Sequence, residues 1–267
     1  MFLNPAGLLA VGVGLAALIA GAAYLAGSLS VTGACAALVV GGLTFGLGGW
    51  PAAALLLGFF ISSSLLSDVG KRRKQGLAEK FAKGGRRDAV QVLANGGLAA
   101  AMAVGFGLWK SDVWIIAMGG ALAAANADTW GTELGVLSSQ RPRMILGSGT
   151  AEIGASGAVT WVGEAASLAG SALIGLLAAG SMGLQAGLAV LVAGFLGATA
   201  DSLLGASLQA VYWCPNCQKQ TERHPYHSCK SATTLVRGKA WLDNDAVNFA
   251  ASLTGAICAA GLWFLGA

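Results

Sequence analysis

Carboxylates recur inside segments of this chain that are otherwise apolar. The stretch ANADTWGTELG, residues 125–135, carries Asp128 and Glu133, while Asp201 and Asp245 belong to two further apolar segments. A carboxylate in hydrocarbon costs several kcal/mol unless it has a partner. Carboxylates that meet at one depth also repel each other unless a cation binds between them. Mg²⁺ held by carboxylates and substrate phosphates is the best fit to such a ligand set, so these four acids are the predicted catalytic magnesium ligands.

The spacing of two of these acids leaves two alternatives open. Asp128 and Glu133 are five residues apart, which turns an ideal helix by about 140° and points the side chains apart. Either Gly131 marks a break in the helix, or the two acids serve different positions of one site.

Polar residues near the acids have the chemistry to bind phosphate oxygens. Arg87, Gln91 and Asn95 recur at four-residue spacing, which places them on one side of a helix where they could line a pocket. Asparagine amides can orient oxygens, and cationic side chains can pair with phosphates. The nucleotide- and phosphate-binding candidates are Arg87, Asn95, Asn126, Arg237, Lys239, Asn244 and Asn248. Asp243, directly before the last apolar run, is predicted to be an N-cap.

A cysteine- and histidine-rich stretch, WCPNCQKQTERHPYHSC, offers a second kind of metal site. Cys214, Cys217 and Cys229 with His227 would supply three thiolates and one imidazole, which closes a tetrahedral structural zinc site. His224 is the alternative imidazole ligand. Such a zinc ion would staple the loop and would not catalyse. Free thiols are the other interpretation of the same residues.

The elements that position these residues follow from composition. Hydrophobic residues make up 55% of the chain, charged residues 10%, and the mean hydropathy is +0.69, values that exclude an ordinary soluble domain. Apolar runs of about 20 residues predict an all-α membrane bundle of about eight transmembrane helices, with seven or nine as alternatives. The predicted spans are residues 6–26, 31–48, 50–67, 90–108, 113–136, 161–180, 184–209 and 244–265.

The chain is predicted to form one transmembrane domain over residues 1–267. Three long connections interrupt it: a basic loop at 68–89, a glycine-rich loop at 138–160 and a Cys/His loop at 210–243. Small residues four apart, such as Gly42 with Gly46 and Gly131 with Gly135, are typical of helices that approach closely in lipid.

Basic residues predict the orientation. Eight lie in residues 71–87, two in 141–143 and five in 219–239, and with eight spans these three loops share one side. The positive-inside rule makes that side cytoplasmic and places both termini outside. We therefore expect a prokaryotic inner or plasma membrane protein whose active site faces the cytoplasm. The net charge of +4 is explained by topology, and no nucleic-acid partner is expected.

Four motifs resemble, in order and spacing, the membrane-protein family that includes the plant phytyl-phosphate kinase of tocopherol synthesis and the animal transmembrane protein nineteen. The resemblance runs from about residue 60 onward; before that the sequence adds only hydrophobic pattern. The motifs are RRDAVQVLANGG at 86–97, ADTWGTELG at 127–135, GATADSLLGASLQ at 197–209 and RGKAWLDNDAVNF at 237–249. The family implies CTP-dependent, Mg²⁺-assisted phosphoryl transfer onto a phytyl- or geranylgeranyl-type monophosphate to give the diphosphate.

One loop departs from that family. Where the family has G-T-x-G-G-V-S-x-x-G-T, this chain has GASGAVTWVGE at 154–164. The departure weakens a phosphate-binding role for this loop.

Two other classes of function use similar residues. A secondary transporter or channel also places coupling acids in glycine-rich helices, and the similarity of ANADT at 125–129 to ATADS at 198–202 hints at an internal repeat. The acids here lie toward one face, which favours surface chemistry over transport. A prenol kinase or a lipid cytidylyltransferase would share the same metal and nucleotide ligands. The expected partners are the bilayer, an isoprenyl monophosphate and a nucleoside triphosphate.

Overall fold

The computed structural model describes residues 5–69, 86–147 and 149–266. Helices dominate it, which confirms the predicted membrane helix bundle. They are α1 (Pro5–Leu25), α2 (Val31–Asp68), α4 (Ala89–Trp109), α5 (Val113–Gly135), α6 (Trp161–Met182), α7 (Leu184–Ser207) and α8 (Asn244–Gly266). Most of the predicted basic loop 68–89 lies outside the described residues.

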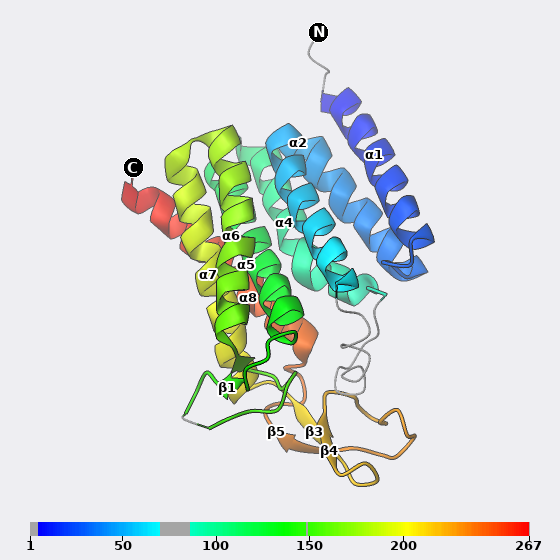
Figure 1. Ribbon diagram of the computed structural model, residues 1–267. Helices are drawn as coiled ribbons and strands as arrows, with labels where there is room; N and C mark the ends of the chain where they lie inside the picture. Colours follow the sequence, from blue (N-terminus) through cyan, green and yellow to red (C-terminus); the bar gives the residue numbers. More distant parts are fainter. Residues whose placement is uncertain (1–4, 70–85, 148, 267) are drawn as a thin grey trace.

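The long helix α2 consists of two membrane-length halves. Gly49 interrupts it with a positive φ of 66°, a conformation that suits glycine, and Pro51 follows inside the helix. A straight helix of 38 residues would measure about 57 Å, nearly twice the hydrocarbon thickness. Figure 1 shows the halves meeting at an angle at the end of the bundle away from the long loops. Residues 31–48 and 50–68 therefore correspond to the second and third predicted spans.

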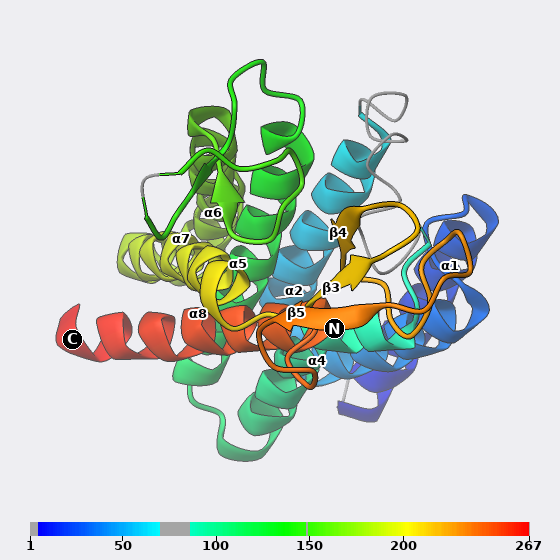
Figure 2. The same cartoon turned by 90° about the horizontal axis from the view of Figure 1, so that it is seen from below.

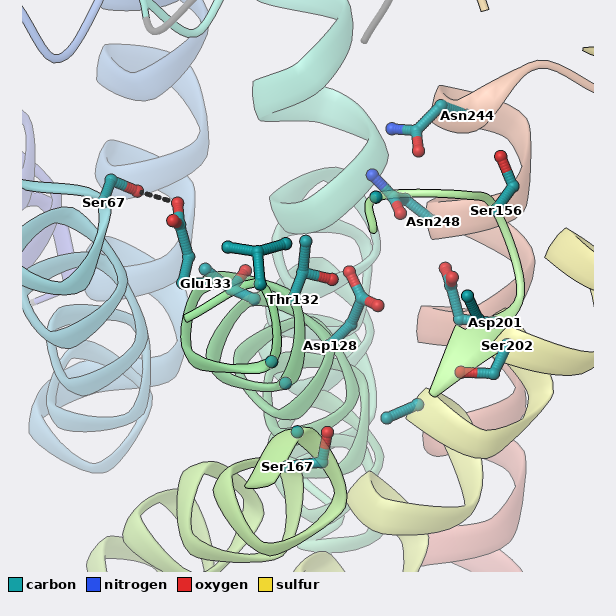
Figure 3. Close-up of a pocket in the computed structure, with 18 of the residues that line it drawn as sticks. Ser67, Asp128, Thr132, Glu133, Ser156, Ser167, Asp201, Ser202, Asn244 and Asn248 are labelled. Atoms are coloured by element: carbon teal, nitrogen blue, oxygen red, sulfur yellow. Dashed lines mark hydrogen bonds between the residues drawn. The ribbon is translucent and has the colours of Figure 1, made fainter. Parts of the chain in front are cut away.

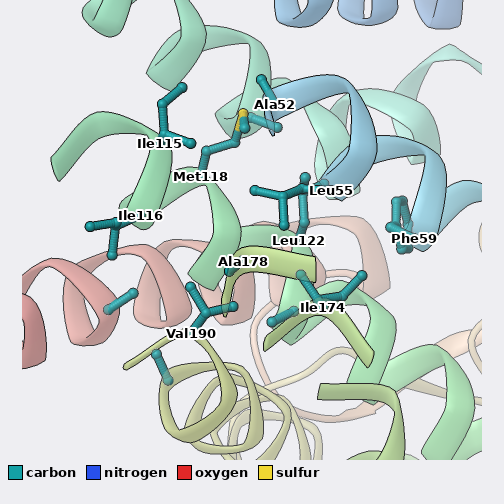
Figure 4. Close-up of a cluster of buried hydrophobic side chains, with 14 of the residues drawn as sticks. Ala52, Leu55, Phe59, Ile115, Ile116, Met118, Leu122, Ile174, Ala178 and Val190 are labelled. Atoms are coloured by element: carbon teal, nitrogen blue, oxygen red, sulfur yellow. The ribbon is translucent and has the colours of Figure 1, made fainter. Parts of the chain in front are cut away.

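Helix α5 is the centre of the bundle. It packs against α2, α4, α6, α7 and α8, and every residue from Ile115 to Ala127 is buried. Figure 4 shows Met118 and Leu122 of this helix meeting Leu55, Ile174 and Val190 from its neighbours. The other six helices are long and apolar enough to cross a membrane. Helix α5 ends in polar residues because its neighbours, and not lipid, surround it.

Small residues allow the helices to approach closely, as the sequence predicted. A Cβ on Gly46 would come within 2.9 Å of the Leu9 Cα on α1. A Cβ on Gly131 would overlap the Ser167 Oγ of α6. In lipid, such contacts stabilise a bundle through close packing, since the hydrophobic effect gives little drive between helices there.

Two small sheets, which the sequence analysis did not predict, lie together at one end of the bundle (Figures 1 and 2). In the glycine-rich loop, β1 (Arg143–Met144) pairs with β2 (Ala158–Val159). In the Cys/His loop, β3 (Val211–Cys214) lies between β4 (Lys219–Thr221) and β5 (Thr234–Arg237), and both pairings are antiparallel. Strands of two to four residues are too short to show an alternating pattern. The start of α1 and the end of α8 lie at the opposite end of the bundle.

Candidate functional site

A polar cleft of about 720 Å³ opens at the end of the bundle that carries the long loops. Its walls are the ends of α2, α5 and α7, the starts of α4, α6 and α8, and the glycine-rich loop. Figure 3 shows acidic, amide and hydroxyl side chains converging on it from these elements. Of the residues predicted from sequence, the cleft gathers Arg87, Asp128, Glu133, Asp201, Asn244, Asp245 and Asn248.

The acids of α5 and α7 face each other across the cleft. The Asp128 and Asp201 carboxyl groups are close enough to share a hydrogen bond, and Asp245 on α8 lines the same cleft at 8% exposure. Within the described part of the chain, the Asp201 Oδ2 is buried without a hydrogen-bond partner. Adjacent carboxylates require a shared proton or a bound cation. This arrangement of oxygens fits a divalent cation.

Glu133 belongs to the opposite wall. Helix α5 continues through Gly131 without a break, so Asp128 and Glu133 do point apart. The Glu133 Oε1 accepts a 2.7 Å hydrogen bond from the Ser67 Oγ of α2 (Figure 3). The second of the two alternatives therefore describes the structure: the two acids occupy different positions of one site.

Two arginines lie just before α4, and one of them, Arg87, is near Glu133. Arg86 and Arg87 both line the cleft, and burial lowers the pKa of Arg87 while the nearby Glu133 carboxylate raises it. The Arg87 backbone is fixed because its N–H donates to the Ser28 carbonyl and its carbonyl accepts from the Ser30 N–H, each at 3.0 Å. The cleft thus offers acids on one wall and guanidinium groups on another.

Helix caps hold the ends that carry these side chains. Asp88 caps α4 because its side chain accepts a hydrogen bond from the Gln91 N–H at 2.9 Å. In turn the Gln91 Oε1 accepts from the Asp88 N–H at 3.1 Å, and the two bonds form a capping box. Asp243 accepts from the Ala246 N–H at 3.0 Å, which confirms its predicted N-cap role on α8. Each cap fixes the first turn of its helix, which carries Gln91 in α4 and Asn244 in α8.

Four predicted phosphate ligands lie outside the cleft. Asn126 is fully buried, accepts hydrogen bonds from the Ser62 and Ser63 hydroxyls, and donates to the Gly170 carbonyl, so it ties α2, α5 and α6 together. Asn95 donates to the Gln91 carbonyl and lines a neighbouring apolar cavity.

The other two of these four lie near the end of β5. Arg237 donates to the Gly205 carbonyl at 2.9 Å and to the Ser156 carbonyl at 3.4 Å, so it braces the glycine-rich loop. Lys239 is exposed and does not line the cleft.

Residues whose role was not predicted from the sequence connect the glycine-rich loop to the Cys/His loop. The Glu222 Oε1 accepts hydrogen bonds from the Ser156 Oγ at 2.9 Å and the Gln209 Nε2 at 2.8 Å, and all three residues line the cleft. Thr132, Glu164 and Arg86 also line it. Nothing in the local sequence around Glu222 marks it, because its partners are distant along the chain.

The Cys/His loop brings four predicted zinc ligands together. Ligand atoms of Cys214, Cys217, His227 and Cys229 all lie within 4.8 Å of one another. The Cys214 and Cys229 sulfurs are 3.5 Å apart, near the separation expected around tetrahedral zinc. A hydrogen bond with His227 lowers the pKa of Cys229 to about 6, which favours its thiolate, whereas a hydrogen bond with Cys229 raises the pKa of Cys217 to about 11. The alternative ligand, His224, instead stacks on Tyr212 with ring centroids 4.5 Å apart.

The fold and the cleft together define a polytopic membrane protein with an acidic and basic site at one end of its helix bundle. The chain belongs to the integral membrane protein family DUF92, which matches residues 14–256. The family resemblance predicted from the motifs is confirmed. The match also extends into the first 60 residues, where the sequence shows only hydrophobic pattern.

Two proteins from different organisms are similar to the chain. Protein PGR of Arabidopsis thaliana is 33% identical over 266 residues, covering 90% of each chain. An uncharacterised membrane protein of Methanocaldococcus jannaschii is 37% identical over 153 residues, covering 57% of this chain and 63% of its own. No solved structure matches the chain.

Proposed function

We propose that this protein is a CTP-dependent kinase that transfers a phosphoryl group to an isoprenyl monophosphate at the cytoplasmic face of the membrane. The observation that carries the proposal is the pairing of Asp128 with Asp201 in a cleft that Arg86 and Arg87 also line. Phosphoryl transfer depends mainly on positioning and on neutralising charge, and it needs little covalent help from the protein. Acids for a metal and guanidinium groups for phosphates are the parts this reaction requires.

Each wall of the cleft has a role in this proposal. Asp128, Asp201 and Asp245 would hold Mg²⁺, which supplies neutralisation of phosphate charge when bound. Arg86 and Arg87 bind phosphate oxygens, and Asn244 and Asn248 orient them. An oxygen of the acceptor monophosphate attacks the γ-phosphorus of CTP, the bond to the β-phosphate oxygen breaks, and CDP and the isoprenyl diphosphate leave. No separate base is assigned because the attacking phosphate is already anionic.

The position of the cleft supports a lipid acceptor. The cleft lies at the end of the bundle where the described basic segments 141–143 and 219–239 gather, the side that the positive-inside rule assigns to the cytoplasm. The chain of a lipid substrate can remain among the helices while its phosphate reaches a water-soluble nucleotide. In the same proposal, Cys214, Cys217, His227 and Cys229 hold a structural zinc ion.

The test is transfer of label from CTP labelled at the γ-phosphate to phytyl or geranylgeranyl monophosphate by the purified protein in nanodiscs. We expect Mg²⁺-dependent labelled diphosphate, loss of labelling in Asp128→Asn, and full labelling in Asp112→Asn. Asp112 is a matched control because it is an exposed acid at the far end of the same helix.

Other products would replace the proposal. Transfer of label to an added prenol, which gives the labelled monophosphate, would indicate a prenol kinase. Transfer of CMP to the lipid with release of labelled pyrophosphate would indicate a cytidylyltransferase. If folded protein transfers nothing from CTP, ATP or GTP to any of these lipids, the kinase proposal is wrong and transport becomes the leading hypothesis.

A further inference from the structure

A narrow apolar groove runs from the cleft into the membrane region between α1, α2 and α4. Its volume is about 120 Å³, and its walls are almost wholly apolar side chains such as Ile19, Val40 and Phe59. Along α2 it extends from Phe60 to Trp50, which is about 15 Å of helix. Helix α1 packs against α2, and α2 against α4, so these three helices form one side of the bundle (Figure 1).

The groove and the cleft share two residues. Arg87 and Gln91 line both, while Asn95 continues the same side of α4 into the groove. The predicted alignment of these three residues on one side of the helix is therefore present. This side of the helix leads from the charged cleft into the apolar groove. A ligand that spans the junction needs an anionic group at Arg87 and an apolar chain beyond it.

The size of the groove restricts that chain. A cavity of about 150 Å³ can hold one benzene molecule, so this groove, at about 120 Å³, accommodates about one five-carbon isoprene unit of a single chain and cannot take two acyl chains. Leu15 and Trp50 line the groove and are 37% and 66% exposed, so the groove reaches the surface of the bundle. The rest of a longer chain can leave the groove there and enter the bilayer.

We propose that this groove binds the first isoprene unit of a single-chain lipid monophosphate, with Arg87 at the junction of chain and phosphate. The identification of the ligand as the acceptor substrate rests on the proposed kinase function. The groove then sets which lipids enter: branched single chains of any length beyond the first unit are accepted, and two-chain phospholipids are excluded.

Groove-filling variants test the kinetic consequence. Ala37→Leu and Val92→Phe place extra carbons in the groove, since both residues line it and both are only partly exposed. We expect KM for geranylgeranyl monophosphate to rise about tenfold, with KM for CTP unchanged. The five-carbon dimethylallyl monophosphate should be affected to the same degree, because its single isoprene unit is the part that the groove binds. Ala22→Leu is the matched control because Ala22 is an exposed residue of α1 that does not line the groove.

Photolabelling provides a second measurement that does not depend on turnover. A geranyl monophosphate analogue with a diazirine on its first isoprene unit is irradiated with the wild-type protein in nanodiscs, and the labelled peptides are identified. We expect label on α1, α2 or α4, competition by geranylgeranyl monophosphate, and reduced label in Ala37→Leu. Label confined to α5–α8, or equal competition by phosphatidylglycerol, would overturn the groove proposal.

The two proposals fail in different ways. If geranylgeranyl monophosphate competes with the label in the groove but no phosphoryl transfer occurs, the groove proposal is supported and the kinase proposal is wrong. If phosphoryl transfer occurs and the groove-filling variants have the same KM as Ala22→Leu at every chain length, the kinase proposal is supported and the groove proposal is wrong.

Discussion

Two polar regions at the same end of the molecule are built in opposite ways. The Cys/His loop collects its four ligand atoms from residues 214–229, a single short stretch that folds around them. The cleft collects its acids from Asp128, Asp201 and Asp245, which belong to three different helices. Local spacing alone can therefore specify the first region, whereas the second exists only when the whole bundle has assembled. Neutralising an acid of the cleft should therefore leave the Cys/His loop intact, and breaking the loop should leave the helix bundle folded.

The largest expected effect is the loss of activity when one facing carboxylate is neutralised. We expect Asp201→Asn to lower kcat by at least about 10²-fold, since it removes charge stabilisation at the reacting phosphates. In buffer without Mg²⁺ we expect the variant to be more stable than the wild type, because the change relieves repulsion with Asp128. In Mg²⁺ the wild-type Tm should rise by several degrees through binding, and the variant Tm should not.

These outcomes are checked by thermal unfolding in detergent with and without Mg²⁺, alongside the transfer assay. Zinc content is the control, and it should stay at one ion per chain because the Cys/His loop does not depend on the cleft. A variant that keeps the full Mg²⁺ shift would show that Asp201 is not a metal ligand.

The next effect comes from breaking the Cys/His loop. Cys217→Ser removes one of four ligands, so we expect the protein to lose its zinc, because a structural zinc site needs all four tetrahedral ligands. Activity should fall about tenfold and not vanish, because the acids of the cleft are carried by the helices. Metal analysis by mass spectrometry measures the zinc, and far-ultraviolet circular dichroism should show the bundle intact. Retention of stoichiometric zinc in this variant would contradict the proposed ligand set.

The sequence predicted the parts of the molecule whose information is local. Apolar runs fixed the spans, and the spacing from Cys214 to Cys229 was sufficient to group the ligands. The helix faces of α4 also followed from spacing alone. The roles that depend on which helices are neighbours could not be predicted from the sequence. Asn126 has the chemistry of a phosphate ligand, but its amide is hydrogen-bonded to Ser62 of α2 and to the Gly170 carbonyl of α6. Glu222 was missed for the converse reason, since Ser156 is 66 residues away.

A smaller effect tests whether the two regions communicate. Glu222 joins them by accepting from Ser156 of the glycine-rich loop and Gln209 after α7. Glu222→Ala removes both hydrogen bonds to a charged acceptor, so we expect a looser loop and about a tenfold loss in kcat/KM. Limited proteolysis should cut more readily near residues 147–157, while zinc content stays unchanged. The matched control is Gln220→Ala, an exposed position on β4. Equal proteolysis in both variants would mean that Glu222 does not hold the loop.

The smallest effect concerns the wall of the cleft that carries Glu133. Ser67→Ala removes one hydrogen bond to a carboxylate that also has the Arg87 guanidinium nearby, so the carboxylate keeps a partner. A hydrogen bond of this kind contributes about 1 kcal/mol, which corresponds to a loss of about fivefold in kcat/KM. Because Ser67 acts through Glu133, the change should appear in KM for the lipid phosphate more than in kcat. Ser181→Ala, near the far end of α6, is the matched control. A fall in kcat as large as that of Asp201→Asn would instead place Ser67 in contact with the reacting groups.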